Sequence, residues 1–176
     1  MTILGAIFAG GQSRRYGSDK ALAAIDGIAM LDRIAAQLAP QCDALVVVGR
    51  EWPGLDSVAD LPHAGLGPLG ALAGALHHAL EAGHEQVLTT GCDLPDIPAD
   101  LVERLQPAPA VLSGQPLLGL WNAAMAETLI AYLGETQDRS MRGWIEQVNA
   151  RLVPPPCALV NINSPEDMAA YRGRTA

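Results

Sequence analysis

Two periodicities of apolar residues alternate along the first part of the chain and predict an α/β fold. Mainly apolar or β-branched runs, typical of strands buried within a sheet, occur at residues 3–8, 44–48, 57–59 and 86–90. Helices are expected at residues 30–38, 69–82 and 98–105. Pro40 and Gly83 should end the first two helices. This alternation predicts a mainly parallel, Rossmann-like sheet with helices on both faces.

The second half of the chain departs from this alternation. Short apolar runs predict further strands at residues 110–113, 117–121, 152–153 and 158–160. Asn122 is expected to cap a helix running to Leu133, a second helix should cover about 140–148, and Ser164 with Pro165 should begin the last helix. We expect this half to add an antiparallel strand and a lid-like excursion over the site.

Length and composition limit the classes of function that need to be considered. The 176 residues predict one domain, residues 1–176, whose core is built from aliphatic side chains because the chain has only three Trp, three Tyr and one Phe. A net charge of −8 argues against nucleic-acid binding. No apolar run approaches the roughly 18 residues of a membrane span, and the start lacks the charges of a signal peptide. We therefore expect no membrane association and a cytoplasmic location.

The residue types that commonly bind metals through sulfur or nitrogen form no recognisable motif. Cys42, Cys92 and Cys157 lack CxxC spacing, which fits a reducing compartment and argues against a zinc knuckle. His77 and His78 are adjacent and so point in different directions on a helix, whereas zinc needs three or four convergent ligands.

The loop after the first strand combines glycines with positive charge. It reads Gly10-Gly11-Gln12-Ser13-Arg14-Arg15-Tyr16-Gly17-Ser18-Asp19-Lys20. A glycine pair lets main-chain N–H groups approach an anion, and the basic side chains add donors for a polyphosphate. The spacing fits neither a Walker A loop nor a dinucleotide fingerprint. The segment therefore predicts a phosphate cradle at the end of the first strand, the alternative being a glycine-rich surface loop with solvated charges.

Two further segments carry candidate chemistry at the same edge of the predicted sheet. Asp93 follows the strand at 86–90, where its carboxylate can bind Mg²⁺; the alternative is a turn-forming Asp before Pro95. The segment Gly67-Pro68-Leu69-Gly70 opens a small-residue helix, and such a helix start suits close approach of a base or an anion. Tight packing of that helix on the sheet would explain the same residues.

The first loop resembles the signature of nucleotide-sugar-type nucleotidyltransferases, Leu-x-Gly-Gly-x-x-x-Arg-Met-Gly-x-Asp-Lys. Within that superfamily it is most similar to the molybdenum cofactor guanylyltransferases. Phe8 and Tyr16 replace the usual leucine and methionine, and both keep an apolar side chain. The resemblance extends over about residues 4–171 and implies a nucleotide-diphospho-sugar transferase type of sheet.

The resemblance also implies roles for single residues outside the first loop. Asp93 matches the magnesium aspartate of the family, and Asp60 matches an Asp that precedes Gly-Pro-Leu and contacts the nucleotide. Guanylyltransferases of the family carry Gly-Pro-Leu followed by small residues at this position, whereas the related cytidylyltransferases carry a segment rich in Gly, Met and Ser. Gly-Pro-Leu-Gly in this chain matches the former, and the resemblance therefore implies GTP as the nucleotide. Gly49 occupies a position after the second strand where the family often has Asn. Gln115, in place of the usual His, and the pair Asn161 and Asn163 match segments near the second substrate or the metal.

The implied reaction transfers GMP from GTP to the terminal phosphate of molybdopterin that already carries molybdenum, releasing pyrophosphate with Mg²⁺ as cofactor. We assign catalysis to Arg14, Lys20 and Asp93, with Asp93 also holding the metal. Molybdopterin should contact Gln115, Asn161 and Asn163. The predicted nucleotide-binding residues are Phe8, Ala9, Gly10, Gly11, Lys20, Asp60, Pro68, Leu69 and Asp93. The resemblance further implies transient contacts with molybdenum insertion proteins and apo-molybdoenzymes.

Two other hypotheses use the same residues. One keeps the fold and changes the substrates, to CTP with molybdopterin or to a sugar phosphate or 2-phospholactate acceptor. The other is a non-catalytic module that binds GTP or the molybdenum cofactor and passes it to a partner. The nucleotide that stabilises the protein separates the first from guanylyl transfer, and pyrophosphate release separates the second.

Overall fold

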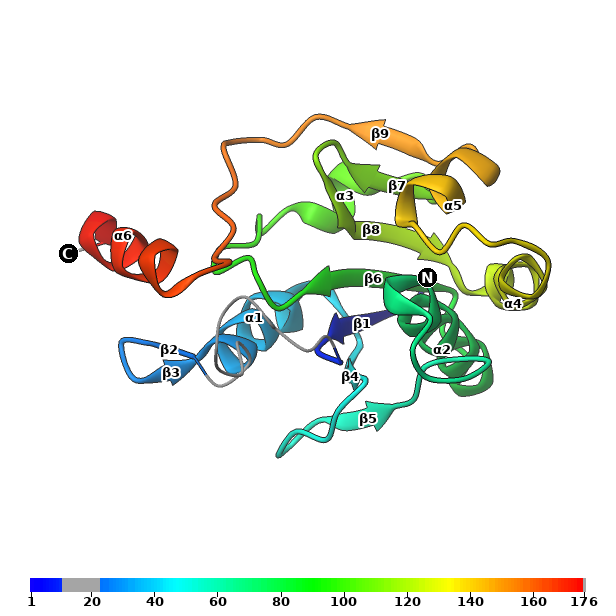
Figure 1. The fold of residues 1–176 in the computed structure, drawn as a ribbon, viewed down its shortest axis with the longest axis horizontal. Helices are drawn as coiled ribbons and strands as arrows, with labels where there is room; N and C mark the ends of the chain where they lie inside the picture. The colour runs from blue at the N-terminus through cyan, green and yellow to red at the C-terminus, as the bar shows by residue number, and fades with distance from the viewer. Residues whose placement is uncertain (11–22, 176) are drawn as a thin grey trace.

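A computed structural model describes residues 1–10 and 23–175 of the chain, whose centre is a seven-stranded sheet in the order β5-β4-β1-β6-β8-β7-β9 (Figure 1). The strands of this sheet are β1 (Ile3–Phe8), β4 (Ala44–Val48), β5 (Asp56–Val58), β6 (Gln86–Gly91), β7 (Ala110–Leu112), β8 (Gln115–Asn122) and β9 (Arg151–Val153). The helices are α1 (Met30–Leu38), α2 (Gly67–Ala82), α3 (Leu101–Leu105), α4 (Ala126–Glu135), α5 (Met141–Gln147) and α6 (Pro165–Thr175).

Four neighbouring strands are parallel, and the rest of the sheet is mixed. β1 pairs with β4 on one side and β6 on the other, and β5 continues the parallel set beyond β4. β8 then runs antiparallel to both β6 and β7, and β9 pairs parallel with β7 at the edge. The mainly parallel sheet and the antiparallel addition in the second half are thereby confirmed.

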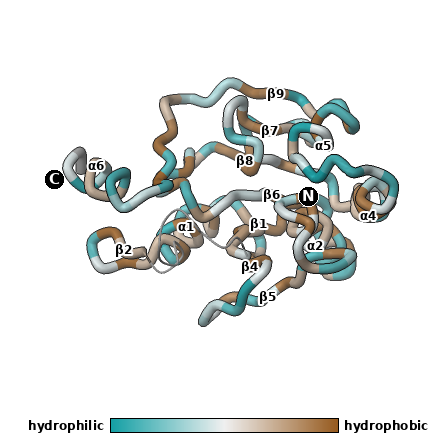
Figure 2. The backbone as a smooth tube through the Cα atoms, in the orientation of Figure 1, coloured by the Kyte–Doolittle hydropathy of each residue, from teal (hydrophilic) through white to brown (hydrophobic). Residues whose placement is uncertain are grey.

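Helices cover both faces of this sheet, as the sequence predicts. α2, α4 and α5 pack on one face, around the buried side chains of Trp121 and Trp144. α1, α3 and α6 lie on the other face, where Leu31, Ile34 and Met168 are buried. Figure 2 shows the resulting pattern, with hydrophobic residues along β1 and α1 and hydrophilic ones in the connection between α4 and α5. None of the described helices is long and apolar enough to span a bilayer.

The small residues of α2 have a packing role. A Cβ atom built on Gly74 would lie 2.1 Å from the carbonyl oxygen of Ala59, so only glycine allows this close approach of the helix to the segment after β5. At its far end α2 stops at Gly83, which has φ of 79° and whose N–H donates to the carbonyls of Ala79 and Leu80. The glycine at position 74 therefore fixes how closely α2 packs against the segment after β5.

Several boundaries differ from the sequence predictions for local reasons. α3 begins at Leu101 rather than Pro98, because side chains of α1 and of the 3-10 turn after it (Ala39–Gln41) hold the preceding residues in an irregular path. Asn122 does not cap a helix; its amide donates to the carbonyl of Ala108, and a 3-10 turn at Ala123–Met125 precedes α4. No strand forms at residues 158–160, since Pro154 to Pro156 provide no N–H groups to extend the pairing beyond β9.

Other predicted features are present or extended. Ser140 caps α5 by accepting from the N–H of Gly143 at 3.0 Å, and Ser164 accepts from the N–H of Asp167 at 3.1 Å at the start of α6. The turn at Asp26 and Gly27 joins a small hairpin, β2 (Ala24–Ile25) and β3 (Ile28–Ala29), which the sequence pattern did not reveal. Both turn residues have positive φ, of 52° and 81°, as a two-residue type I′ hairpin turn requires.

Candidate functional site

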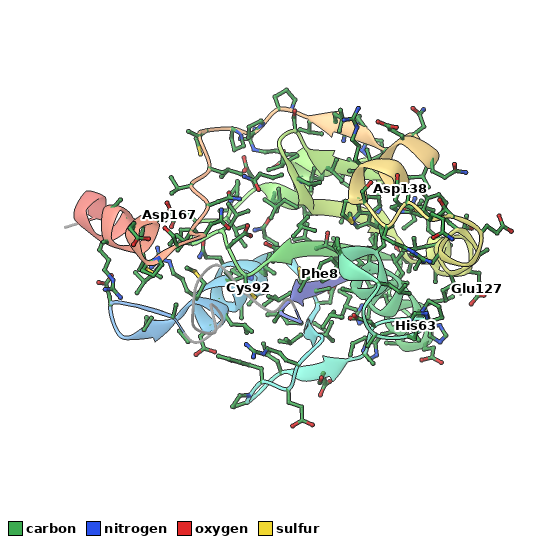
Figure 3. All side chains as sticks on the ribbon, in the orientation of Figure 1. Phe8, His63, Cys92, Glu127, Asp138 and Asp167 are labelled. Carbon is green, nitrogen blue, oxygen red and sulfur yellow. The ribbon has the colours of Figure 1, made fainter. Side chains whose placement is uncertain are left out.

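The carboxyl ends of the parallel strands bring the predicted loops together at one edge of the sheet. Phe8, the last residue of β1, pairs with Val48 of β4 and with Gly91 of β6. The segments that follow, beginning at Ala9, Gly49 and Cys92, therefore leave the sheet side by side. Figure 3 shows Phe8 and Cys92 at this end of the sheet, the end from which α6 projects. Ligands of open α/β sheets bind at such an edge.

Gly10 and Gly49 lie in direct backbone contact at this edge. Gly49 has φ of +86°, and a Cβ built on it would lie 2.6 Å from the Cα and 2.9 Å from the nitrogen of Gly10. The N–H of Ala9 donates to the carbonyl of Val48, and the N–H of Gly49 donates to the carbonyl of Val58. A side chain at position 49, such as the Asn that the family resemblance implies there, has no room in this arrangement. The path of the backbone therefore explains why this chain has glycine at position 49.

A cavity of about 470 Å³ opens beside these glycines. This volume lies within the range usual for small-molecule sites, about 300–1,000 Å³. Five of its lining residues come from the segment that leads into α2 or from α2 itself, and the others come from the end of β1 and from β8. The lining residues are Phe8, Gly10, Asp60, Gly65, Gly67, Pro68, Ala71 and Leu117.

Asp60 is the acidic side chain among the residues that line this cavity. It is partly buried, and that burial raises the pKa of its carboxyl above the usual value. No hydrogen-bond donor satisfies this carboxylate in the part of the chain that the structure describes. An acceptor that is partly desolvated and borders a cavity is suited to bind donor groups of a ligand.

A second group of polar side chains is linked by hydrogen bonds around Asp93. The amide of Asn161 donates to Oδ2 of Asp93 at 3.2 Å, and the amide of Gln115 donates to Oδ1 of Asn161 at 2.7 Å. The backbone adds a third link, since the N–H of Ile162 donates to the carbonyl of Asp93 at 2.7 Å. Three predicted residues from three distant segments are therefore adjacent in the fold.

The outcomes for the remaining predicted residues differ. Ile162 is buried, whereas Asn161 before it is half-buried and Asn163 after it is exposed. Leu69 is fully buried in the core and does not line the cavity, so a contact between Leu69 and a nucleotide stays a prediction. Gly11, Arg14 and Lys20 lie outside the described residues, and the phosphate cradle likewise stays a prediction.

Sequence reasoning missed some residues that line the cavity. Gly65 and Ala71 flank the Gly-Pro-Leu-Gly segment, and only proximity to that motif could have indicated them. Leu117 lies two residues from the predicted Gln115, but nothing in the sequence places its side chain on the cavity side of β8.

The donors present at Asp93 fit a magnesium ion better than a transition metal. Within residues 1–10 and 23–175 no group of three or more His, Cys, Asp or Glu side chains could enclose a metal ion. Mg²⁺ usually binds through one or two carboxylates and completes its shell with water and substrate phosphates. Asp93 offers such a carboxylate, and Asn161 holds one of its oxygens in place.

The match to known proteins decides the family. Residues 5–152 match the model of the MobA-like NTP transferase domain. The chain belongs to this family. Members of the MobA-like family are nucleotidyltransferases by definition of the domain, and this protein is therefore a nucleotidyltransferase.

Individual relatives agree with that membership along almost the whole chain. The chain is 36% identical to a protein of Rhodobacter capsulatus named molybdenum cofactor guanylyltransferase, with 99% of this chain and 97% of the relative covered. It is 32% identical to a protein of the same name from Nitrobacter hamburgensis, with 94% and 90% covered. These values extend the similarity beyond the family model into the C-terminal segment that contains Asn161.

Solved structures confirm the fold. Molybdopterin-guanine dinucleotide biosynthesis protein A from Archaeoglobus fulgidus superposes with a TM-score of 0.75 at 20% identity, covering 98% of both chains. A 4-diphosphocytidyl-2C-methyl-D-erythritol synthase superposes with a TM-score of 0.70 at 15% identity, covering all of both chains. The sheet of this protein is therefore the one that nucleotidyltransferases use, as predicted.

Proposed function

We propose that this nucleotidyltransferase transfers GMP from GTP to the terminal phosphate of the molybdenum-loaded molybdopterin cofactor, releasing pyrophosphate. The observation that carries the proposal is the unsatisfied Asp60 carboxylate beside the cavity at the start of α2. The names of the relatives, which are 32–36% identical over almost the full chain, support the same activity.

The cavity suits guanine for a chemical reason. Guanine presents two neighbouring donors, its N1–H and its exocyclic amino group, to which a carboxylate can accept in pairs. Cytosine and adenine present an acceptor beside their amino group instead, so each leaves one carboxylate oxygen facing a lone pair. Pro68, Ala71 and Leu117 supply apolar walls for the faces and edges of the ring. A site whose polar group must be satisfied discriminates strongly against a ligand that lacks the partner.

The triphosphate is proposed to extend from this cavity along Gly10 towards Asp93. Backbone amides of Gly10 and Gly11, together with Arg14 and Lys20, bind its phosphates in this proposal. Asp93 holds Mg²⁺, which when bound neutralises phosphate charge and the charge that develops on the leaving pyrophosphate. Gln115, Asn161 and Asn163 then receive molybdopterin on the side of β8, where Asn161 bonds Asp93 and Gln115 bonds Asn161.

Such a reaction needs positioning more than a side-chain nucleophile. The attacking phosphate of molybdopterin is ionised at neutral pH, so no general base is required. It displaces pyrophosphate from the α-phosphorus in line, and the protein contributes orientation and electrostatic stabilisation. The product is subsequently passed, in this proposal, to molybdenum insertion proteins and apo-molybdoenzymes.

Nucleotide-dependent melting tests the choice of base. GTP with Mg²⁺ at about one hundred times its Kd should stabilise the fold by about 2.7 kcal/mol. For a chain of this size that raises Tm by about 5–10 °C. CTP and ATP should give much smaller shifts, and Asp60→Asn should remove the difference between nucleotides. A larger shift with CTP would favour cytidylyl transfer and refute the role of Asp60.

Pyrophosphate release tests the reaction itself. The protein, GTP, Mg²⁺ and molybdopterin should yield pyrophosphate and a guanine dinucleotide, and omission of molybdopterin should stop the release. Binding of GTP without release under these conditions would identify a carrier instead of a transferase.

A further inference from the structure

The segment that carries Asp93 has no regular secondary structure of its own. It connects the end of β6 at Gly91 to the start of α3 at Leu101. Pro95 and Pro98 lie within it and cannot donate backbone hydrogen bonds. The path of this segment, and with it the position of the Asp93 carboxylate, must therefore be fixed by contacts from other elements.

One face of α1 supplies such contacts. Arg33, Gln37 and Gln41 are spaced four residues apart, which places them on the same side of the helix and of the 3-10 turn that continues it. Nε of Arg33 and Nε2 of Gln37 both donate to the carbonyl of Pro95, each at 2.9 Å. Oε1 of Gln37 also accepts from the N–H of Ile97 at 2.7 Å. The backbone is held on both sides of Asp96.

Asp93 is held from its other side by the segment before α6. Ile162 donates to its carbonyl at 2.7 Å and Asn161 to its carboxylate at 3.2 Å. The next side chain, Leu94, is buried in the core. The two residues from Asp93 to Pro95 span at most about 7 Å, so a shift of the Pro95 carbonyl is passed directly to the carboxylate.

Arg33 also links this segment to α6. Its guanidinium donates to Oδ1 of Asp96 at 2.9 Å and to the hydroxyl of Tyr171 at 3.0 Å. The Tyr171 hydroxyl lies 2.9 Å from both carboxylate oxygens of Asp96. The fixed geometry of a guanidinium lets one side chain hold a carbonyl, a carboxylate and a hydroxyl together.

We propose that Arg33 and Gln37 are positioning residues for Asp93. They fix the carbonyl of Pro95 from α1, so that the Asp93 carboxylate stays where it can hold Mg²⁺ against the triphosphate. The inference rests on the proposed function for the role of Asp93, and it adds two residues that touch neither substrate nor metal.

Gln41 provides a matched control for Gln37. Each glutamine donates to the helix carbonyl four residues earlier, donates to one carbonyl of the Asp93 segment and accepts from one N–H that follows it. Gln41 makes its contacts with Pro98 and Val102, farther along the chain from Asp93. Gln37→Ala and Gln41→Ala should therefore lower Tm by similar amounts.

Their effects on the reaction should differ. Gln37→Ala should reduce kcat by about 10- to 100-fold, the scale of a misplacement near 1 Å at a catalytic group. Its KM for GTP should change much less than its kcat, because the cavity at Asp60 that is proposed to bind the base is unchanged. Gln41→Ala should keep nearly wild-type kcat. Arg33→Ala should behave like Gln37→Ala, with Arg104→Ala, which breaks only the exposed pair with Asp100, as its control. Equal losses of kcat in Gln37→Ala and Gln41→Ala would overturn the proposal.

Hydrogen exchange gives a readout that needs no turnover. The N–H of Ile162, which bonds the Asp93 carbonyl, should exchange faster in Gln37→Ala than in Gln41→Ala, in full-length protein without ligand. Equal exchange in the two variants would contradict the inference. Absence of turnover in the wild type would instead refute the proposed function, and the exchange comparison would still decide whether Gln37 fixes the Asp93 segment.

Discussion

Replacing Gly49 by alanine should disturb the proposed nucleotide site more than its loop position suggests. Gly49 has φ of +86°, and the added Cβ would meet the Cα of Gly10 at 2.6 Å and its nitrogen at 2.9 Å. Both obstructing atoms belong to backbone, so no side chain can rotate away. Relief requires that the turn after β1 and the turn after β4 separate.

The cost can be divided into two parts. A left-handed backbone costs a residue with a Cβ about 1–2 kcal/mol. Overpacking of a close contact adds about 1–3 kcal/mol. The sum of about 2–5 kcal/mol corresponds to a loss of about 4–20 °C in Tm for a chain of this size. The same displacement moves Gly10, so the KM for GTP should also rise.

Gly54→Ala separates the two parts. Gly54 has φ of +81° and nothing within 4 Å of its built Cβ, so this variant carries the backbone cost without the collision. Calorimetry should place its Tm between those of the wild type and Gly49→Ala, with GTP binding unchanged. Equal melting temperatures and equal GTP affinities for the two variants would refute the view that the Gly10–Gly49 contact shapes the site.

Further predictions concern charge, metal and thiol chemistry. Lys20→Ala and Asp93→Ala should each cost several kcal/mol of transition-state stabilisation, roughly 10²–10³-fold in kcat/KM for pyrophosphate release, while the protein stays folded; near-wild-type turnover would refute these roles. Because burial raises the pKa of Asp60, its ionised form disfavours folding, and this penalty is present at neutral pH and disappears as pH falls below the folded pKa. Asp60→Asn should therefore melt above the wild type at pH 7 and lose that advantage in acid, while an advantage independent of pH would contradict this cause. Burial raises the pKa of the Cys42 thiol to about 12, whereas Cys157 is exposed. A thiol reagent at pH 8 should therefore label Cys157 before Cys42, as measured by mass spectrometry, and equal labelling would argue against the burial of Cys42.

The sequence carried enough information for the sheet and for the placement of Asp93. Runs such as Ala44–Val48 are apolar throughout because their strands are covered on both faces, and this pattern survives without any tertiary knowledge. Since parallel strands end at a common edge, the loops after β1 and β6 had to meet. The proximity of Gln115, Asn161 and Asp93 was reached only through family resemblance, because no local rule relates residues so far apart.

Features that depend on close approach could not be predicted. Nothing in the sequence around Gly49 distinguishes a glycine that collides with Gly10 from one that simply turns the chain. In the sequence, Arg33 and Gln37 only form part of the polar face of an amphipathic helix. Their contacts with the carbonyl of Pro95 join segments too far apart for any local pattern to indicate. The late start of α3 follows from the contacts of Gln37 with Ile97 and of Gln41 with Pro98, which override the local preference for a helix beginning at a proline.

A crystal structure with Mg²⁺ and a GTP analogue that resists hydrolysis tests the central claim most directly. Guanine should occupy the cavity with its N1–H and amino group on Asp60, and the triphosphate should run past Gly10 to a metal ion on Asp93. Guanine bound outside that cavity, or phosphates with Asp93 out of reach of their metal ion, would contradict it.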